Sequence, residues 1–333
     1  MKFLCIQTAF LGDVILATSA AEKLHQFFPT AEIDFLLRKG NESVFENHPF
    51  IHEVIVLDKK NDKWKNFFSI ASKVRKKKYD YLINFHRFGS SGYITWRSGA
   101  KEKIGFDKNP FSFCYTKKIK HEIGNCKHEV ERNHELIAHL TDNIPAKPKL
   151  YPSEKILERI KSHLPSAILQ QTSYICIAPA SVWITKQFPK EKWIELINNV
   201  PNEISVFLLG GKVDASSCDN IKRETRNTKH ETIEVLAGKL SILETAALMK
   251  DAKMNYVNDS APMHIASAMN APVTAIFCST IPAFGFGPLS DNSRIVETKE
   301  KLECRPCGLH GYKQCPEEHF KCARTIDIKE ILQ

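Results

Sequence analysis

Short apolar runs alternate with amphipathic stretches along most of the chain, and this alternation constrains the fold more than any other feature. In the first half, strands are predicted at residues 2–8, 32–37, 53–57 and 79–85, and helices at residues 14–28 and 64–78. The strand runs are apolar throughout, whereas the helical stretches place apolar residues every three or four positions. Strands that alternate with helices form parallel βαβ units with right-handed crossovers.

The same alternation restarts near residue 173. Strands are predicted at residues 174–180, 204–211, 254–259 and 271–277, and helices at residues 191–200, 241–252 and 261–270. Between the halves, four prolines punctuate residues 143–173, with one helical pattern at 153–164. The sequence therefore predicts an α/β protein with two Rossmann-like domains facing each other across a cleft. The expected division is a first domain at residues 1–150, an interdomain connection at 151–172, a second domain at 173–300, and a Cys-rich tail with a C-terminal helix at 301–333.

Composition fits a globular chain that binds anions. Of the 333 residues, 43% are hydrophobic and 47 Lys and Arg face 38 Asp and Glu, which gives a net charge of +9. Such a charge suits nucleic acid, an anionic membrane surface or phosphorylated small molecules. The densest basic run, residues 73–78 (KVRKKK), is either the solvated end of a helix or a contact for anionic lipid head groups. Asp13 interrupts the apolar start, and no run reaches the length of a membrane-spanning helix, so we expect a cytoplasmic protein.

Polar residues follow several predicted strands, where open parallel sheets bind their ligands. Asp13 follows the first strand, and it either caps the next helix or acts as a catalytic base. No GxGxxG is present there, so the dinucleotide fingerprint is absent. Lys186 lies in the loop after residues 174–180, where it is either solvated or a partner for phosphate.

Two later strand ends carry further candidates. Asp214 follows a Gly-Gly pair, which either forms a simple turn or places the carboxylate against a ribose. Asp259 ends another strand, and Pro262 is predicted at the first position of the next helix. The N–H groups of that helical turn favour an anion, and His264 lies on the same turn, where a histidine is otherwise structural.

These segments resemble glycosyltransferase family 9, the ADP-heptose:lipopolysaccharide heptosyltransferases. The resemblance runs through Leu11–Gly12–Asp13, residues 79–107, the KQFP segment at 186–189 and, most specifically, residues 237–277. It implies a GT-B fold, in which the N-terminal domain binds the acceptor and the C-terminal domain binds the nucleotide sugar. It also implies transfer of a heptose from ADP-heptose to a lipid A-linked saccharide of lipopolysaccharide. The enzyme would act while bound peripherally to the cytoplasmic face of the inner membrane.

The resemblance assigns roles residue by residue. Asp13 corresponds to the general base of the family. The implied donor-binding residues are Lys186 at the phosphate, Asp259 with the backbone of Ser260 and Ala261 at the diphosphate and sugar, His264 beside them, Asp214 at the ribose and Leu240 at the adenine. The usual D-T/S-G-P motif is D-S-A-P in this chain, so Ala261 adds a methyl group at a point of close backbone approach.

One carboxylate suffices for an inverting transfer, because the base acts on the face opposite the leaving group. Lys186 and helix-terminal amides can stabilise the leaving diphosphate, and no DxD motif lies near a strand end, so no catalytic metal is expected. On the acceptor side, Arg87, Arg97 and Lys117, with Lys118 and Lys120, either bind an anionic saccharide or are ordinary surface cations. Phe10, Phe88 and Trp96 either line the same side or pack in the core.

Four of the ten cysteines cluster near the C-terminus. Cys304, Cys307, Cys315 and Cys322 follow a C-x2-C-x7-C-x6-C pattern, with His310 and His319 as substitute ligands. This spacing suits a structural zinc ion, and disulfide or redox chemistry and plain free thiols stay open beside it.

Three other functions use the same features. The cysteines and basic run also suit a zinc-containing nucleic-acid-binding protein, although aromatic residues do not interleave with the basic run, so we expect no nucleic-acid partner. A dehydrogenase is disfavoured by the missing GxGxxG. A glycosyltransferase of the same fold that uses another nucleotide sugar is the third.

Overall fold

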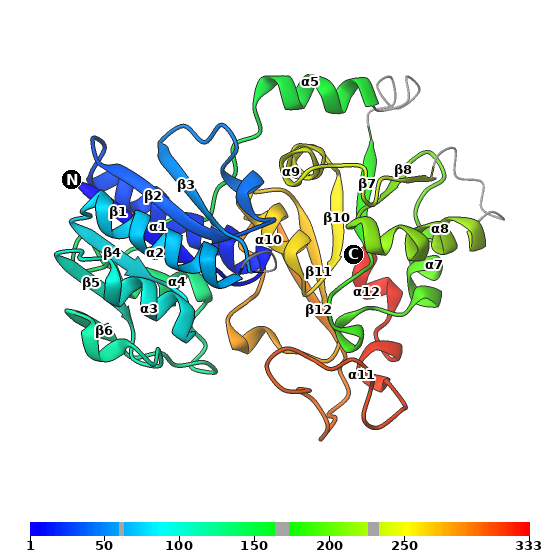
Figure 1. Ribbon diagram of the computed structural model, residues 1–333. Coiled ribbons are helices and arrows are strands. Elements are labelled where there is room, and N and C mark those ends of the chain that lie inside the picture. Colours follow the sequence, from blue (N-terminus) through cyan, green and yellow to red (C-terminus); the bar gives the residue numbers. More distant parts are fainter. Residues whose placement is uncertain (60–62, 164–172, 226–232) are drawn as a thin grey trace. The chain divides into compact units, whose positions relative to one another are not determined.

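The computed structural model describes residues 1–59, 63–163, 173–225 and 233–333. The chain divides into two compact units, Met1–Tyr151 and Pro152–Gln333. Each unit contains a six-stranded sheet whose hydrogen-bonded neighbours are parallel (Figure 1). The α/β class predicted from the alternation is confirmed in both units.

The first unit is built on the strand order β3-β2-β1-β4-β5-β6. Its strands are β1 (Lys2–Gln7), β2 (Glu32–Arg38), β3 (Ile51–Leu57), β4 (Tyr81–Asn84), β5 (Glu102–Phe106) and β6 (Lys117–Ile119). Its helices are α1 (Leu11–Phe27), α2 (Lys63–Lys77), α3 (Gly89–Arg97) and α4 (Glu129–Glu135). The order reverses between β1 and β4, so the loops after these two strands border the switch point of the sheet.

The second unit repeats this topology with the order β12-β11-β10-β7-β8-β9. Its strands are β7 (Tyr174–Ala178), β8 (Ser205–Leu208), β9 (Ile233–Val235), β10 (Met254–Asn258), β11 (Val273–Phe277) and β12 (Ser293–Glu297). Its helices are α5 (Glu154–His163), α7 (Lys190–Asn198), α8 (Ala215–Glu224), α9 (Ile242–Lys250), α10 (Ala261–Ala268), α11 (Lys321–Arg324) and α12 (Ile328–Leu332). Here the order reverses between β7 and β10.

Apolar strands and small helical residues build the core. Phe3, Leu4 and Ile6 of β1 are fully buried, as the continuous apolar run predicts for a strand covered on both faces. Helix α1 begins at Leu11, three residues before the predicted start. Ala17 and Ala21 on this helix are fully buried, and their small side chains suit close approach of α1 to the strands it contacts.

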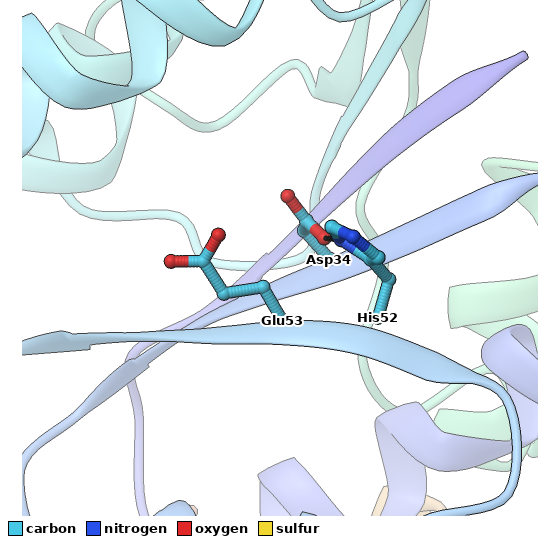
Figure 2. Close-up of side chains that lie close together, drawn as sticks. All are labelled: Asp34, His52 and Glu53. Carbon is cyan, nitrogen blue, oxygen red and sulfur yellow. Dashed lines mark hydrogen bonds and ion pairs between the residues drawn. The ribbon is translucent and has the colours of Figure 1, made fainter.

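One buried charge cluster lies inside the first sheet (Figure 2). Asp34 of β2 has only 3% of its side chain exposed and accepts hydrogen bonds from His52 at 2.9 Å and Lys77 at 2.7 Å, and from the Tyr79 hydroxyl. Lys77 also pairs with Glu53 on β3. The basic run at 73–78 is therefore only partly a solvated helix end, because one of its lysines neutralises two carboxylates of the sheet.

The expected interdomain connection differs from the structure. Helix α5 lies within it but packs against α9, with an ion pair between Arg159 and Glu244, and so belongs to the second compact unit (Figure 1). Residues 164–172 of the expected connection lie outside the described residues. Within the described parts of the chain, no helix is long and apolar enough to cross a membrane.

Candidate functional site

The switch points of the two sheets carry several of the predicted site residues. Parallel sheets bind ligands at the carboxyl ends of their strands where the strand order reverses. In the first unit, Asp13 follows β1 and Arg87 follows β4. In the second unit, Lys186 follows β7 and Asp259 follows β10. Sequence reasoning placed Asp13, Lys186 and Asp259 beyond strand ends and gave Arg87 as a possible acceptor-side cation, and the topology pairs the four two by two.

Lys186 and Asp259 contact each other directly. The Nζ atom of Lys186 lies 2.7 Å from Oδ2 of Asp259, and the side chains are only 14% and 8% exposed. The Thr280 hydroxyl donates to the same carboxylate oxygen at 2.6 Å. The charged pair is thus largely removed from solvent, where electrostatic interactions are stronger than at the surface.

Asn258 holds the Lys186 loop against the end of β10. Its side-chain oxygen accepts the backbone N–H of Phe188 at 2.9 Å, and its amide donates to the Pro179 carbonyl at 2.8 Å. Both partners belong to the loop that follows β7. Asn258 therefore fixes the loop that carries Lys186 near both of its ends.

Helix α10 begins beside this pair. Ser260 is its N-cap residue and Ala261 its first residue, so Pro262 occupies the second helical position, one later than predicted. The first N–H groups of such a helix have no partner within the helix and favour an anion. His264 lies on the same turn but is 95% buried, with an exposed fraction of 5%, so its ring packs into the unit rather than projecting from it.

The loops with Asp214 and Leu240 are packed together. Oδ2 of Asp214 accepts the N–H of Gly211 at 2.8 Å, and the N–H of Gly238 donates to the carbonyl of Gly210 at 2.9 Å. Gly238 has φ +74°, and a Cβ atom there would lie 2.8 Å from the Lys212 Cα, so glycine is required for this approach. Leu240 is half-buried in the turn before α9.

Asp13 caps α1. It is the third residue of the helix, and its Oδ2 accepts the N–H of Phe10, the N-cap residue, at 3.1 Å. The residue is half-buried, so part of its surface remains accessible. The capping alternative is thus present in the structure, and it fixes the carboxylate at the switch point of the first sheet.

Glu129 and Arg132 were missed by sequence reasoning. Both are buried on α4, which packs against α1, and Arg132 donates to Glu129 Oε2 from Nε at 2.9 Å and from Nη2 at 2.8 Å. The pKa of Glu129 is raised to about 7, chiefly by burial and also by Asp13, against the lowering effect of Arg132 and Arg87. Asp13, Arg87, Glu129 and Arg132 therefore form one electrostatic cluster.

His86 is a second missed residue at this switch point. Its Nδ1 atom lies 2.8 Å from the Thr8 hydroxyl, which links the loops after β4 and β1. The pKa of His86 is lowered to about 4, chiefly by burial and also by the nearby charges of Lys59 and Arg87. The imidazole is thus neutral at physiological pH. Nothing in the sequence indicates either residue's place in the site, because Glu129 lies in the field of Asp13 and His86 contacts Thr8, both distant in sequence.

The other predicted acceptor residues lie apart from this cluster. Arg97 is exposed at the end of α3 and stacks over Trp96, with 5.7 Å from the guanidinium carbon to the ring centroid. Lys117 begins the edge strand β6 and contributes to the electrostatic field at His139. Phe10, Phe88 and Trp96 are 54%, 64% and 44% exposed, which contradicts the core-packing alternative for them.

The four C-terminal cysteines surround one cavity of about 170 Å³, together with His319. All four are free thiols, and the structure contains no disulfide bond among these four residues. His310 is exposed and is not part of the cavity lining.

Comparisons with known proteins identify the family. The family model described as glycosyltransferase family 9 (heptosyltransferase) matches residues 67–319. Lipopolysaccharide heptosyltransferase 1 of Campylobacter coli is 24% identical, over 100% of this chain and 97% of that protein.

Two solved structures share the fold. The family 9 glycosyltransferase of Veillonella parvula DSM 2008 superposes with a TM-score of 0.84 at 22% identity, covering 99% of this chain and 95% of that one. The Escherichia coli ADP-heptose lipopolysaccharide heptosyltransferase II gives 0.79 at 20% identity, covering 100% and 99%. The fold is thus that of the GT-B enzymes, as predicted. With the family model spanning most of both units, the chain belongs to glycosyltransferase family 9 and is a glycosyltransferase.

Proposed function

We propose that the enzyme transfers a heptose from ADP-heptose to a lipid A-linked saccharide of the lipopolysaccharide core, with inversion at the anomeric carbon. The observation that carries this proposal is the Lys186–Asp259 pair beside the start of α10, which forms an anion site at a switch point. The names of the relatives supply the sugar and the acceptor class: the similar proteins are lipopolysaccharide heptosyltransferases, and one is named for ADP-heptose.

On the donor side, Lys186 and the first amides of α10 bind the diphosphate and stabilise the charge that develops on the departing ADP. The ion pair with Asp259 already orients the Lys186 side chain, so little reorganisation is needed when phosphate binds. Asp214 and Leu240 lie in neighbouring loops after β8 and β9, where they suit the ribose and the adenine.

On the acceptor side, Asp13 is the general base. It takes the proton of the attacking hydroxyl as the acceptor oxygen bonds to the anomeric carbon and the bond to the ADP oxygen breaks. The Phe10 N–H holds one carboxylate oxygen, which fixes the direction of the other. Arg87 lies near the same cluster and suits the anionic groups of the acceptor.

A panel of nucleotide sugars tests the donor. Thermal shifts are measured with ADP-heptose, ADP-glucose, UDP-glucose and GDP-mannose, and turnover is then measured with each donor that binds. A response confined to ADP sugars supports the proposal. A preference for another nucleotide supports instead a glycosyltransferase of the same fold that uses a different donor. Ala261 in the D-S-A-P motif is the feature that favours this alternative. A flat panel overturns both.

Helix α2 is the surface we assign to peripheral contact with an anionic membrane. Trp64 and Phe68 on its first half are 66% and 52% exposed, whereas Lys65, Arg75 and Lys76 are exposed along the same helix. Exposed aromatic rings beside basic residues are typical of helices that lie in the interface of a bilayer. An apolar cavity of about 430 Å³ borders Trp64, Phe68 and neighbouring residues, large enough for part of an acyl chain.

Vesicle sedimentation tests this surface. The protein should bind vesicles that contain phosphatidylglycerol and not vesicles of phosphatidylcholine alone. W64A/F68A should bind the anionic vesicles at least tenfold more weakly than wild type. Phe27 is also exposed (43%) but ends α1, so F27A is the matched control and should bind normally. Equal binding by all three proteins contradicts the assignment.

A further inference from the structure

The segment between β12 and α11 has no helix or strand in the structure and forms the loops drawn in orange and red before α11 (Figure 1). Long connections without secondary structure are uncommon in compact domains and usually carry a function of their own. This segment contains Cys304, Cys307 and Cys315, and Cys322 follows on α11. The proposed transfer reaction uses none of these thiols.

We propose that Cys304, Cys307, Cys315 and Cys322 bind one structural zinc ion. All four line the same cavity; Cys307 and Cys322 are buried, at 8% and 4% exposed, and Cys304 and Cys315 are partly exposed. Four thiolates form the closed tetrahedral set of structural zinc sites. The thiols surround the cavity rather than meet at its centre, and rotation about χ1 brings a thiol from one staggered position to the next.

His319 supports the thiol set as a hydrogen-bond donor. Its Nδ1 accepts the backbone N–H of Lys321 at 3.0 Å, so the ring proton lies on Nε2, which is 4.0 Å from the sulfur of Cys304. An N–H directed at a thiolate is the usual outer partner of a metal ligand. The four cysteines are therefore the ligands, and His319 orients one of them.

Among the described residues, the group whose ligand atoms already lie close enough to share a metal ion is neutralised by a lysine. Asp34, His52 and Glu53 bring three ligand atoms within 4.8 Å of one another (Figure 2). However, Lys77 pairs with both carboxylates, at 2.7 Å from Asp34. An ammonium group thus occupies the position that a cation would take between these carboxylates.

The cysteine segment is bonded to the loop of Lys186. The N–H of Tyr312 donates to the Thr185 hydroxyl at 2.7 Å, and the N–H of Thr185 donates to the carbonyl of Tyr312 at 3.1 Å. Gly311 packs so closely that a Cβ atom there would lie 2.9 Å from the Thr185 hydroxyl. Thr185 is therefore a positioning residue through which the segment fixes Lys186.

A second connection reaches Asp259. Arg305 donates to the carbonyls of Cys278 and Thr280 at 2.8 and 2.7 Å, and the Thr280 hydroxyl donates to Asp259. A zinc ion that orders the segment thus orders both members of the Lys186–Asp259 pair. This second part of the inference rests on the proposed donor site, whereas zinc binding itself does not.

Metal analysis of full-length protein purified without chelator tests zinc binding. We expect about one zinc per chain in the wild type and in C114S/C126S, whose cysteines lie in the first unit, and less than a tenth of that in C307S/C322S. Less than about 0.3 zinc per chain in the wild type, stoichiometric iron in its place, or zinc retained by C307S/C322S overturns the proposal. If C307S/C322S does not fold, an organomercurial titration of the wild type decides: zinc release must track modification of this thiol set.

The positioning role has its own test. T185V should keep one zinc per chain but raise the KM for the nucleotide sugar about tenfold, and T185S, which keeps the hydroxyl, should restore it. An unchanged KM in T185V overturns the positioning role and leaves zinc binding standing. If no variant or wild type transfers a heptose, the proposed function fails, and the zinc content still decides the metal site.

Discussion

Lys186 and Asp259 form an ion pair of 2.7 Å at the point where the second sheet reverses its strand order. Asn258 holds the loop that carries Lys186, and the cysteine segment contacts that loop at Thr185. The same segment reaches Asp259 through Arg305, which donates to the Thr280 carbonyl. The pair is thus a fixed feature of the unit before any donor binds. A preoriented cation costs little reorganisation when charge develops on a leaving diphosphate.

Replacing Lys186 should weaken ADP binding. K186M removes the cation and leaves Asp259 with only the Thr280 hydroxyl, so ADP affinity should fall about tenfold to a hundredfold. Isothermal calorimetry with ADP measures the change. K190M is the matched control, because the Lys190–Glu224 pair has the same 2.7 Å length but is exposed, and it should bind ADP normally. Normal binding by K186M would contradict the assignment.

Glu129 should make stability depend on pH. Its pKa is about 7 in the folded chain against an ordinary value of 4.5, so between these values the folded state holds a proton that the unfolded state has lost. The stability that this proton provides is fully present below pH 4.5 and declines by about 3 kcal/mol as the pH rises to 7. E129Q has no such ionisation and should lack this decline.

Urea unfolding of both proteins between pH 4.5 and 8 measures this difference. E135Q, at the other end of the same helix and more exposed, should follow the wild type. Parallel profiles for wild type and E129Q would show that Glu129 does not carry the raised pKa.

Gly238 should tolerate no side chain. G238A puts a Cβ atom 2.8 Å from the Lys212 Cα in addition to the strain at φ +74°. G40A carries strain at φ +99° but meets nothing within 4 Å, so it isolates the cost of the positive φ. G238A should therefore be about 1–3 kcal/mol less stable than G40A and bind ADP more weakly. Equal stability and unchanged ADP affinity would be inconsistent with this packing.

Asp34 should matter for stability and not for donor binding. D34N removes one of the two carboxylates that pair with Lys77 in a nearly buried network. This should lower the free energy of unfolding by about 3 kcal/mol. Asp80 pairs with Lys101, which is 78% exposed, so D80N should cost less than about 1 kcal/mol. Thermal unfolding measures both variants. ADP affinity should be unchanged in each, and a loss in D34N would mean that the cluster acts beyond the first unit.

The central strands could be predicted because their apolar runs are continuous, as in β1, β7 and β11. The edge strands β6 and β12 could not, whereas the edge strand β3 was predicted at residues 53–57. Strand β6 is three residues long and contains two lysines, and β12 is polar at its start, so neither has the pattern of a buried strand. Helix α8 was not predicted for a similar reason, because most of its residues are polar.

The positions of the site residues in the chain could be predicted from the sequence, but the contacts between these residues could not. Asp13, Lys186 and Asp259 each follow a strand, which the sequence shows directly. That Lys186 pairs with Asp259, and that Glu129 lies in the electrostatic field of Asp13, depends on segments that are distant in sequence. The exposure of Phe88 and Trp96 also required the structure, because aromatic residues are equally common in cores.

The measurement that tests the account most directly is heptose transfer by D13N. Asparagine retains an oxygen that can accept the Phe10 N–H, so the helix cap and the fold should be preserved. Wild type, given ADP-heptose and a lipid A-linked saccharide, should yield the heptosylated acceptor by mass spectrometry. D13N should turn over about 10²–10⁴-fold more slowly with ADP affinity unchanged. Wild-type turnover by D13N, or no heptose transferred by the wild type, would contradict the account.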